Sequence, residues 1–184
     1  MTVSIELQME QMGQRAKKAA RVLSAAAPAA KTQALRALAA LLIERQPDIL
    51  KANALDVDAA KAANMDAPRL DRLTLTPRIM ADMADACLHV ADMADEVGVL
   101  EQQWQRPNGL MIGKMRIPLG VIAMIFESRP NVTIDAAILC LKAGDAVILR
   151  GGSEAIHSNL ALAGLLHEAL RLSLIHISEP TRLR

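Results

Sequence analysis

The sequence predicts an α/β protein in which a helical N-terminal region precedes a small parallel sheet. Three observations carry this prediction. Alanine-rich helical patterns fill the first half of the chain. Two short apolar runs, 119–126 and 146–149, are separated by a segment of helix length, as in a parallel βαβ unit. A Gly-rich turn and a further helical pattern follow the second run and complete a βαβα order.

The first half of the chain is expected to be helical. Apolar residues recur there at three- and four-residue steps, which places them on one face of each helix. The expected helices cover about 5–27, 30–45, a segment from Pro47 onward, and 77–93. Thr76-Pro77 is typical of an N-cap followed by proline at the first helical position. We interpret these apolar stripes as core, without a functional role.

A β-hairpin is expected next, over 98–117. Segments 99–105 and 110–117 both suit extended strands, and Pro107-Asn108-Gly109 lies between them. Asn-Gly is a strong local signal for a hairpin turn. The chain is therefore divided into a helical part (1–97), this hairpin, a βαβα part (118–171) and a C-terminal tail (172–184).

In the βαβα part, the runs 119–126 and 146–149 are continuous in apolar residues, which favours strands buried on both faces with a right-handed crossover between them. The intervening helix is expected over 131–142, closed by Gly144 at a C-cap position. The last helix is expected over 155–171. Its predicted inward residues are Leu160, Ala163, Leu166 and Leu170.

The Gly-rich corner after the second strand is a candidate site. Arg150, Gly151 and Gly152 lie where ligands of open α/β sheets bind. Glycines allow close approach, arginine suits phosphate, and the N-terminus of the following helix favours anions through its free N–H groups. These features predict a site for a phosphate-bearing nucleotide. The same two glycines also suit an ordinary structural turn, and the motif is neither GxGxxG nor a P-loop.

Four polar residues follow the first strand, namely Glu127, Arg129, Asn131 and Asp135. They could build part of a site, or they could serve only to begin a helix. Asn131 is a reasonable N-cap residue.

The composition argues against several other classes of protein. The chain has 184 residues, a formal net charge of +1, one Trp, one Phe and no Tyr, which disfavours a nucleic-acid partner. No apolar stretch approaches the roughly 18 residues that a membrane span needs. The first ten residues do not resemble a signal peptide. Cys87 and Cys140 form no CxxC pair, so we expect two reduced, buried thiols, no metal site and a cytoplasmic protein.

One long stretch carries a family resemblance. Residues 116–154 read RIPLGVIAMIFESRPNVTIDAAILCLKAGDAVILRGGSE, and this closely resembles glutamate-5-semialdehyde dehydrogenases, a branch of the aldehyde dehydrogenase superfamily. The segment ESRPNVT separates this branch from ordinary aldehyde dehydrogenases, which carry a Pro-Trp-Asn motif there. Upstream, LKANALD (50–56) and LDRLTLT (70–76) also resemble the family. The resemblance covers about residues 10–171 and implies the start of a Rossmann-like, NADP-binding domain of the aldehyde dehydrogenase fold.

The resemblance also implies an activity. These enzymes reduce L-glutamyl 5-phosphate with NADPH to L-glutamate 5-semialdehyde and phosphate, in proline biosynthesis. A cysteine thiolate attacks the acyl phosphate, phosphate leaves, and hydride then reduces the thioester. The full-length enzyme is expected to be a homo-oligomer acting on this small-molecule substrate.

Five residues receive roles through the resemblance. Arg150 matches the position of a basic residue near the adenosine ribose, which assigns it to the NADP 2′-phosphate. Gly151 and Gly152 would line the same pocket, and Glu154 would contact a ribose hydroxyl, although its offset from Arg150 differs from that of the superfamily's glutamate. Asn131 would match the oxyanion-hole asparagine, although the segment 131–144 is shorter than its superfamily counterpart.

The nucleophile is not among these residues. The family's catalytic cysteine lies in a second domain further downstream, and neither Cys87 nor Cys140 matches it. We therefore interpret the chain as a truncated N-terminal fragment that is inactive by itself. Two alternatives are a fragment of another acyl-reducing aldehyde dehydrogenase relative, perhaps one acting on a thioester, and a non-catalytic nucleotide-binding module.

The C-terminal tail, 172–184, does not resemble the family. Its segment LSLIHISEPTR matches a translation of the transposon-end adapter used in DNA library preparation, which predicts a non-native tail in which His176, Ser178 and Glu179 have no function. The alternative is a genuine short strand with a functional His176.

Overall fold

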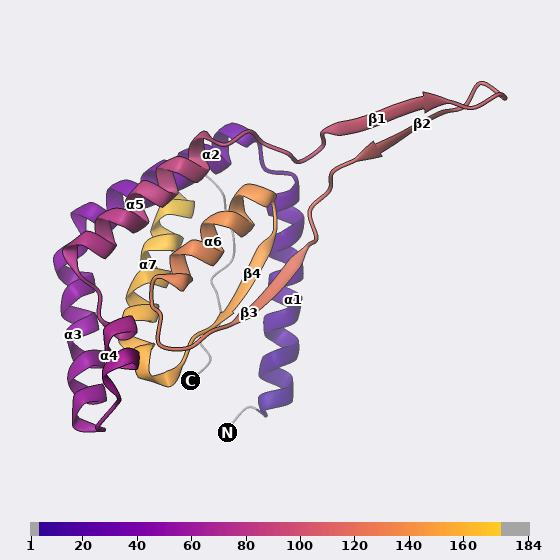
Figure 1. The fold of residues 1–184 in the computed structure, drawn as a ribbon. Coiled ribbons are helices and arrows are strands. Elements are labelled where there is room, and N and C mark those ends of the chain that lie inside the picture. Colours follow the sequence, from indigo (N-terminus) through magenta and orange to yellow (C-terminus); the bar gives the residue numbers. More distant parts are fainter. Residues whose placement is uncertain (1–3, 174–184) are drawn as a thin grey trace.

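The structure is a computed structural model, and it describes residues 4–173. Its elements in chain order are α1 (Ile5–Ser24), α2 (Pro28–Glu44), α3 (Gln46–Ala62), α4 (Ala67–Leu73), α5 (Pro77–Asp92), β1 (Leu100–Gln105), β2 (Met111–Met115), β3 (Val121–Ile125), α6 (Val132–Ala143), β4 (Ala146–Arg150), a 3₁₀ turn η1 (Ser153–Ala155) and α7 (Ile156–Leu172). Helices surround one short parallel strand pair, and a separate hairpin projects from this body (Figure 1). The predicted α/β fold is confirmed.

Local signals in the sequence set several helix ends. The Thr76 hydroxyl accepts a hydrogen bond from the Ile79 N–H, so it caps α5 as predicted. Gly144 ends α6 with a φ of 77°, a left-handed conformation that glycine adopts without strain. Helix α4 was not predicted. Its signal was present, because Asp66 caps it by accepting from the Arg69 N–H and a proline lies in its first turn.

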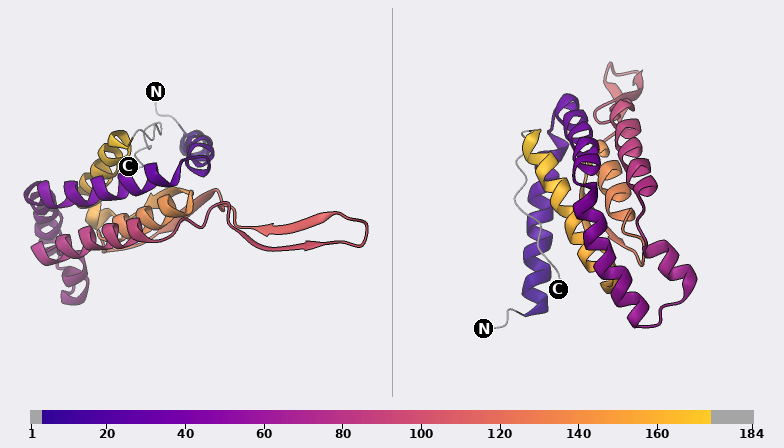
Figure 2. Two further views of the ribbon diagram at one scale, coloured as in Figure 1. Left: turned by 90° about the horizontal axis from the view of Figure 1, so that it is seen from above. Right: turned by 90° about the vertical axis from the view of Figure 1, so that its left-hand side faces the viewer.

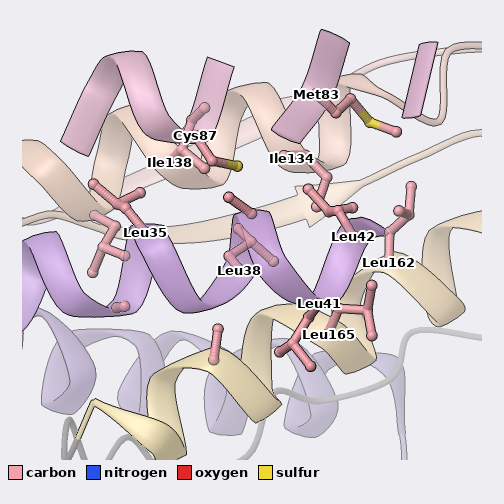
Figure 3. Close-up of a cluster of buried hydrophobic side chains, with 14 of the residues drawn as sticks. Leu35, Leu38, Leu41, Leu42, Met83, Cys87, Ile134, Ile138, Leu162 and Leu165 are labelled. Atoms are coloured by element: carbon pink, nitrogen blue, oxygen red, sulfur yellow. The ribbon is translucent and has the colours of Figure 1, made fainter. Parts of the chain in front are cut away.

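The main core forms around α2, which packs against both α5 and α7 (Figure 2). Figure 3 shows leucines of α2 between side chains of α5 and α6 on one side and of α7 on the other. Leu35 and Leu42 are completely buried there. The cluster also includes Ala146 of β4, so the helical part and the βαβα part share one core. The division of the chain into parts 1–97 and 118–171 stays a prediction.

Two polar contacts are buried within this body. Lys31 is 1% exposed, and its ammonium pairs with the Asp95 carboxylate at 2.6 Å and donates to the Lys142 carbonyl at 3.2 Å. The hydrogen bonds of Asn53 connect α3 to the segment before α5. Its amide donates to the Leu73 carbonyl at 2.8 Å and accepts from the Leu75 N–H at 2.8 Å. Burying these groups is tolerable because each has its partner.

The strands β3 and β4 are parallel, with Val121 opposite Ala146 and Ile125 opposite Arg150, so the predicted βαβ unit is confirmed. The prediction that the first strand is buried on both faces is wrong. Val121 is 39% and Ile125 74% exposed. The physical reason is that the sheet has two strands, and the two strands lie between α1 and α6, which contact them over part of their surface (Figure 1).

The predicted hairpin is confirmed. Strands β1 and β2 pair antiparallel, and Gly109 in the turn has a φ of 88°, which suits the predicted Asn-Gly signal. At the base of the hairpin, the Arg116 guanidinium forms ion pairs with Glu96 and Glu101. Figure 1 shows the hairpin extending away from the helices.

The face predicted for the last helix is only partly correct, because Leu166 and Leu170 are half-buried and pack against the core but do not form the centre of the buried face. The buried residues of α7 are Ser158, Leu162, Leu165 and Ala169, whereas Leu160 is 42% exposed. Helix α7 ends at Leu172. The remainder of the predicted non-native tail after Ser173, with His176, Ser178 and Glu179, lies outside the described residues.

Candidate functional site

The Gly-rich corner begins where β4 ends. Arg150 is the last residue of the strand and is exposed, Gly151 is half-buried and Gly152 is buried. The Phe126 N–H donates to the Arg150 carbonyl at 3.1 Å, which extends the strand pairing by one residue. The loops after β3 and β4 therefore lie together at one end of the strand pair, near the start of α7 (Figure 1).

Glu154 joins these two loops. Its Oε1 accepts a hydrogen bond from the Ser128 N–H at 2.7 Å and another from the Ser128 hydroxyl at 2.8 Å. Ser128 lies in the ESRPN segment, is 5% exposed and has a φ of 43°. A side chain in this left-handed region is strained unless its surroundings hold it. The hydrogen bonds to Glu154 hold Ser128 in this conformation. Ser128 lies three residues before Asn131.

Two opposing effects set the charge of Glu154. Burial raises the pKa of its carboxyl, but hydrogen bonds from its own backbone, from the Ser128 hydroxyl and from the Ser128 N–H outweigh burial, and the positive charge of Arg150 adds to them. The net pKa lies below the ordinary value of glutamate. The carboxylate therefore stays charged at neutral pH and accepts both hydrogen bonds.

At Gly151 and Gly152, neighbouring side chains occupy the space that a Cβ atom would need. A Cβ at Gly152 would overlap the Glu154 carboxylate, and a Cβ at Gly151 would overlap the Asn159 amide and lie 3.3 Å from the Phe126 ring. The side chain of Glu154 can fold back over the chain because position 152 has no side chain.

Two of the backbone N–H groups at the N-terminus of the last helix, which was predicted to favour anions, are already hydrogen-bonded to a side chain. The buried Asp56 carboxylate of α3 accepts from the His157 N–H at 3.1 Å, from the Ser158 N–H at 2.7 Å and from the Ser158 hydroxyl at 2.6 Å. These N–H groups are occupied, and the negative charge of Asp56 compensates the positive end of the helix. A phosphate at this corner would depend on Arg150 instead.

Asn131 precedes the first residue of α6, as predicted, but its side chain does not cap the helix. Its amide Nδ2 donates to the Asp135 carboxylate at 3.0 Å. Both side chains line an open cleft of about 480 Å³ between α4, α5 and the start of α6. Arg150, Gly151, Gly152 and Glu154 do not line this cleft, so the cleft beside Asn131 is distinct from the Gly-rich corner.

Neither cysteine is placed as a nucleophile. Both are buried free thiols. Burial, with a smaller contribution from the charge of Asp135, raises the pKa of Cys87 to about 12. Burial also raises the pKa of Cys140. A thiol in such surroundings is protonated at neutral pH and poorly reactive.

Residues 4–173 contain no cluster of three or more His, Cys, Asp or Glu residues suited to a metal ion. Within the same range, no helix is both long enough and apolar enough to cross a membrane.

Comparison with known proteins shows which enzymes this chain resembles. No family model matches the chain. A gamma-glutamyl phosphate reductase from Nitratidesulfovibrio vulgaris is 69% identical over 168 residues, which is 91% of this chain and 40% of the relative. Another from Desulfovibrio desulfuricans is 66% identical over 163 residues, covering 89% of this chain and 38% of the relative. Over about nine-tenths of its length, the chain is similar to gamma-glutamyl phosphate reductases. It spans about 40% of the length of these curated relatives.

Solved structures of gamma-glutamyl phosphate reductases have a similar fold over the matched residues. The gamma-glutamyl phosphate reductase of Thermotoga maritima has a TM-score of 0.88 and 38% identity, covering 91% of this chain and 41% of its own. That of Saccharomyces cerevisiae has a TM-score of 0.85 and 26% identity, with coverages of 91% and 44%. A probable aldehyde dehydrogenase from Listeria monocytogenes has 16% identity and a TM-score of 0.67 over 90% of this chain and 34% of its own, which shows the shared fold.

Two features of the candidate site were not predicted from the sequence. The first is the contact between Ser128 and Glu154, and the second is the capping of α7 by Asp56. A signal for the second was present, since Asn53 and Asp56 lie on the same face of α3 as the apolar Ile49 and Val57. Polar residues on the inward face of a helix indicate buried partners elsewhere in the chain.

Proposed function

We propose that this chain supplies the dinucleotide corner and the carbonyl-binding loop of a reductase that converts L-glutamyl 5-phosphate to L-glutamate 5-semialdehyde with NADPH, in proline biosynthesis. The observation that carries the proposal is the 69% identity over 168 residues to a gamma-glutamyl phosphate reductase. In this reaction the acyl phosphate gains a hydride, phosphate leaves, and the product is an aldehyde.

A nicotinamide cofactor is supported by the fold shared with aldehyde dehydrogenases. Arg150 supports NADP in particular, because it is exposed at the carboxyl end of β4 and carries a fork of donors suited to a 2′-phosphate. The half-buried Gly151 lies beside it. Bound at this corner, the dinucleotide supplies the hydride.

Asn131 supports the role of an oxyanion donor. Its side-chain amide carries two N–H groups, and Asp135 accepts from one of them. The second N–H would donate to the carbonyl oxygen of the acyl group as negative charge develops on it. Glu154 would position this donor by holding Ser128, three residues away. A ribose contact would use the other oxygen of Glu154.

The chain by itself is proposed not to catalyse the reduction. The family's mechanism needs an activated thiolate, and both cysteines of this chain are buried. The two free thiols also support a cytoplasmic location, since disulfides are rare in reducing compartments.

A homo-oligomer is proposed for the complete enzyme, with the hairpin as its contact arm. The hairpin projects from the body and carries several exposed apolar side chains (Figure 1). These side chains are Leu100, Trp104, Leu110, Met111 and Met115. Light scattering of the complete enzyme with and without Met111→Lys and Met115→Lys would test this arm, and an unchanged mass would contradict it.

A chimera tests the function. Residues 1–171 replace the matching part of the Nitratidesulfovibrio vulgaris reductase, and phosphate-dependent reduction of NADP⁺ by glutamate 5-semialdehyde is measured. We expect activity from the chimera and none from the isolated chain. A chimera that folds without this activity contradicts the proposed function. In the active chimera, Arg150→Ala should weaken the binding of NADPH more than the binding of NADH. Equal weakening of both would contradict the role of Arg150 at the 2′-phosphate.

A further inference from the structure

The cleft beside Asn131 is lined by charges of both signs. Three carboxylates, from Asp71, Asp82 and Asp135, and two guanidinium groups, from Arg72 and Arg129, face it. They come from three separate elements or their flanks, namely α4, α5 and the start of α6. A cleft with a few converging polar groups is typical of a small-molecule site.

These five charges are not neutralised by each other. The ion pairs found in residues 4–173 involve other side chains, so none of the five is paired with another described residue. Carboxylate and guanidinium groups in one cleft normally gain by pairing. Their separation leaves both signs available to a ligand that itself carries an ammonium and an acidic group.

Asp135 is the best placed of the three carboxylates. It is half-buried, whereas Asp71 and Asp82 are exposed at the rim. Its Oδ2 accepts from the Asn131 amide at 3.0 Å. Burial raises the pKa of Asp135 above its ordinary value, and the Asn131 hydrogen bond only partly offsets this. A ligand cation at the second carboxylate oxygen would supply the missing compensation.

The Asn131 amide and the Asp135 carboxylate are neighbours in the cleft, because Asn131 Nδ2 and Asp135 Oδ2 lie 3.0 Å apart. Asp135 keeps its second oxygen and Asn131 its second N–H for a ligand. A glutamyl substrate carries an ammonium group near one end and the reacting carbonyl at the other, so one molecule can contact both side chains. An ammonium on Asp135 therefore leaves the reacting carbonyl within reach of the Asn131 amide.

We propose that this cleft holds the amino-acid end of the substrate, with Asp135, helped by Asp82, binding the α-ammonium group and Arg129 and Arg72 binding the α-carboxylate. The inference rests on the proposed function and adds to it the residues that select an α-amino acid over a simple acyl chain. Asp135 is then a specificity-determining residue, because its carboxylate contacts the part of the substrate that does not react.

The test uses the chimera described above and two aldehydes. Glutamate 5-semialdehyde carries the α-amino group, and 5-oxopentanoate lacks it. The measured quantity is the ratio of kcat/KM between the two. Asp135→Asn keeps the shape of the side chain and removes its charge, so we expect the ratio to fall on the order of 10- to 100-fold. Asp85→Asn, an exposed change on α5 outside the cleft, is the matched control.

The outcomes separate the two proposals. A chimera that reduces NADP⁺ with both aldehydes and keeps its ratio after Asp135→Asn overturns this inference and leaves the proposed function standing. An inactive wild-type chimera overturns the proposed function instead. If Asp135→Asn does not fold, Arg129→Gln decides, since loss of the α-carboxylate contact should raise the KM for glutamate 5-semialdehyde. An unchanged KM overturns the inference.

Discussion

Helix α2 and strand β3 are both rich in apolar residues, but they end in different surroundings. In α2, Leu35 and Leu38 are at most 1% exposed, whereas in β3 Val121 is 39% and Ile125 74% exposed. Helix α2 contacts α3, α5, α6 and α7, while β3 pairs with β4 alone and contacts α1. An apolar run in the sequence therefore shows that a segment can be buried. The number of elements packed against it determines how much of its surface is buried.

The largest expected contrast is between truncations in these two elements. Leu42→Ala should lower the free energy of unfolding by about 4 kcal/mol, because it leaves a cavity at a fully buried position. Ile125→Ala should change it by less than about 0.5 kcal/mol, because the side chain is already exposed. Urea unfolding followed by circular dichroism measures both. Equal losses in the two variants would break the comparison.

A second test concerns the buried polar contacts of the helical body. Asp56→Ala removes the acceptor of three hydrogen bonds at the start of α7 and leaves their donors without a partner. We expect a loss of about 3 kcal/mol in the free energy of unfolding. Asp58→Ala, exposed on the same helix, serves as the control and should be nearly neutral. Similar losses in both would mean that the capping of α7 contributes little.

The buried ion pair gives a smaller effect. Lys31→Met removes the ammonium and leaves the Asp95 carboxylate, which is 11% exposed, without its partner. We expect a loss of about 2 kcal/mol, somewhat below that of a fully buried pair because water still reaches Asp95. Adding Asp95→Asn to Lys31→Met should restore part of the lost free energy of unfolding. A double mutant that is less stable than Lys31→Met alone would contradict this account. Lys51→Met on the exposed face of α3 is the control.

The smallest effect concerns the contact between the two loops at the end of the strands. The pKa of Glu154 is lower in the folded chain than its ordinary value, so the contact with Ser128 is intact at neutral pH and is lost as the pH falls through the folded-state pKa. The Ser128 amide signal in an NMR titration should stay constant around neutral pH and shift only when the pH falls below the ordinary pKa of a glutamate carboxyl. Glu154→Gln should abolish the shift. A Ser128 signal that titrates near neutral pH would show that another group controls it.

Much of the fold could be predicted because its signals are local. Thr76-Pro77, Asn108-Gly109 and Gly144 each act within a few residues of their own position, and each was placed correctly. The parallel pairing of the two apolar runs was also predicted. The face of α7 was predicted only in part, because alanine and leucine occur around most of that helix and its periodicity does not select one side.

The site was predicted less well because its contacts are not local. Asp56 reaches the start of α7 from 101 residues away in the sequence, and it occupies the N–H groups assigned to a phosphate. Glu154 contacts Ser128 from 26 residues away. Asn131 does not cap α6 with its side chain, because its backbone is helical, with a φ of -57° and a ψ of -31°, rather than extended as at most N-caps. The roles of Arg150, Gly151, Gly152, Glu154 and Asn131 toward ligands stay predictions.

The contact between Glu154 and Ser128 constrains any attempt to redesign this protein. A designer who wishes to alter dinucleotide preference would naturally change the residues around Arg150, and Glu154 would be among the first choices. The same carboxylate holds Ser128 at a φ of 43°, three residues before Asn131. A substitution at the proposed ribose contact would thus release the loop that carries Asn131, the proposed carbonyl donor. A substitution of Glu154 should therefore change cofactor preference and turnover at the same time. Mutant libraries that vary Glu154 should vary Ser128 in the same clones.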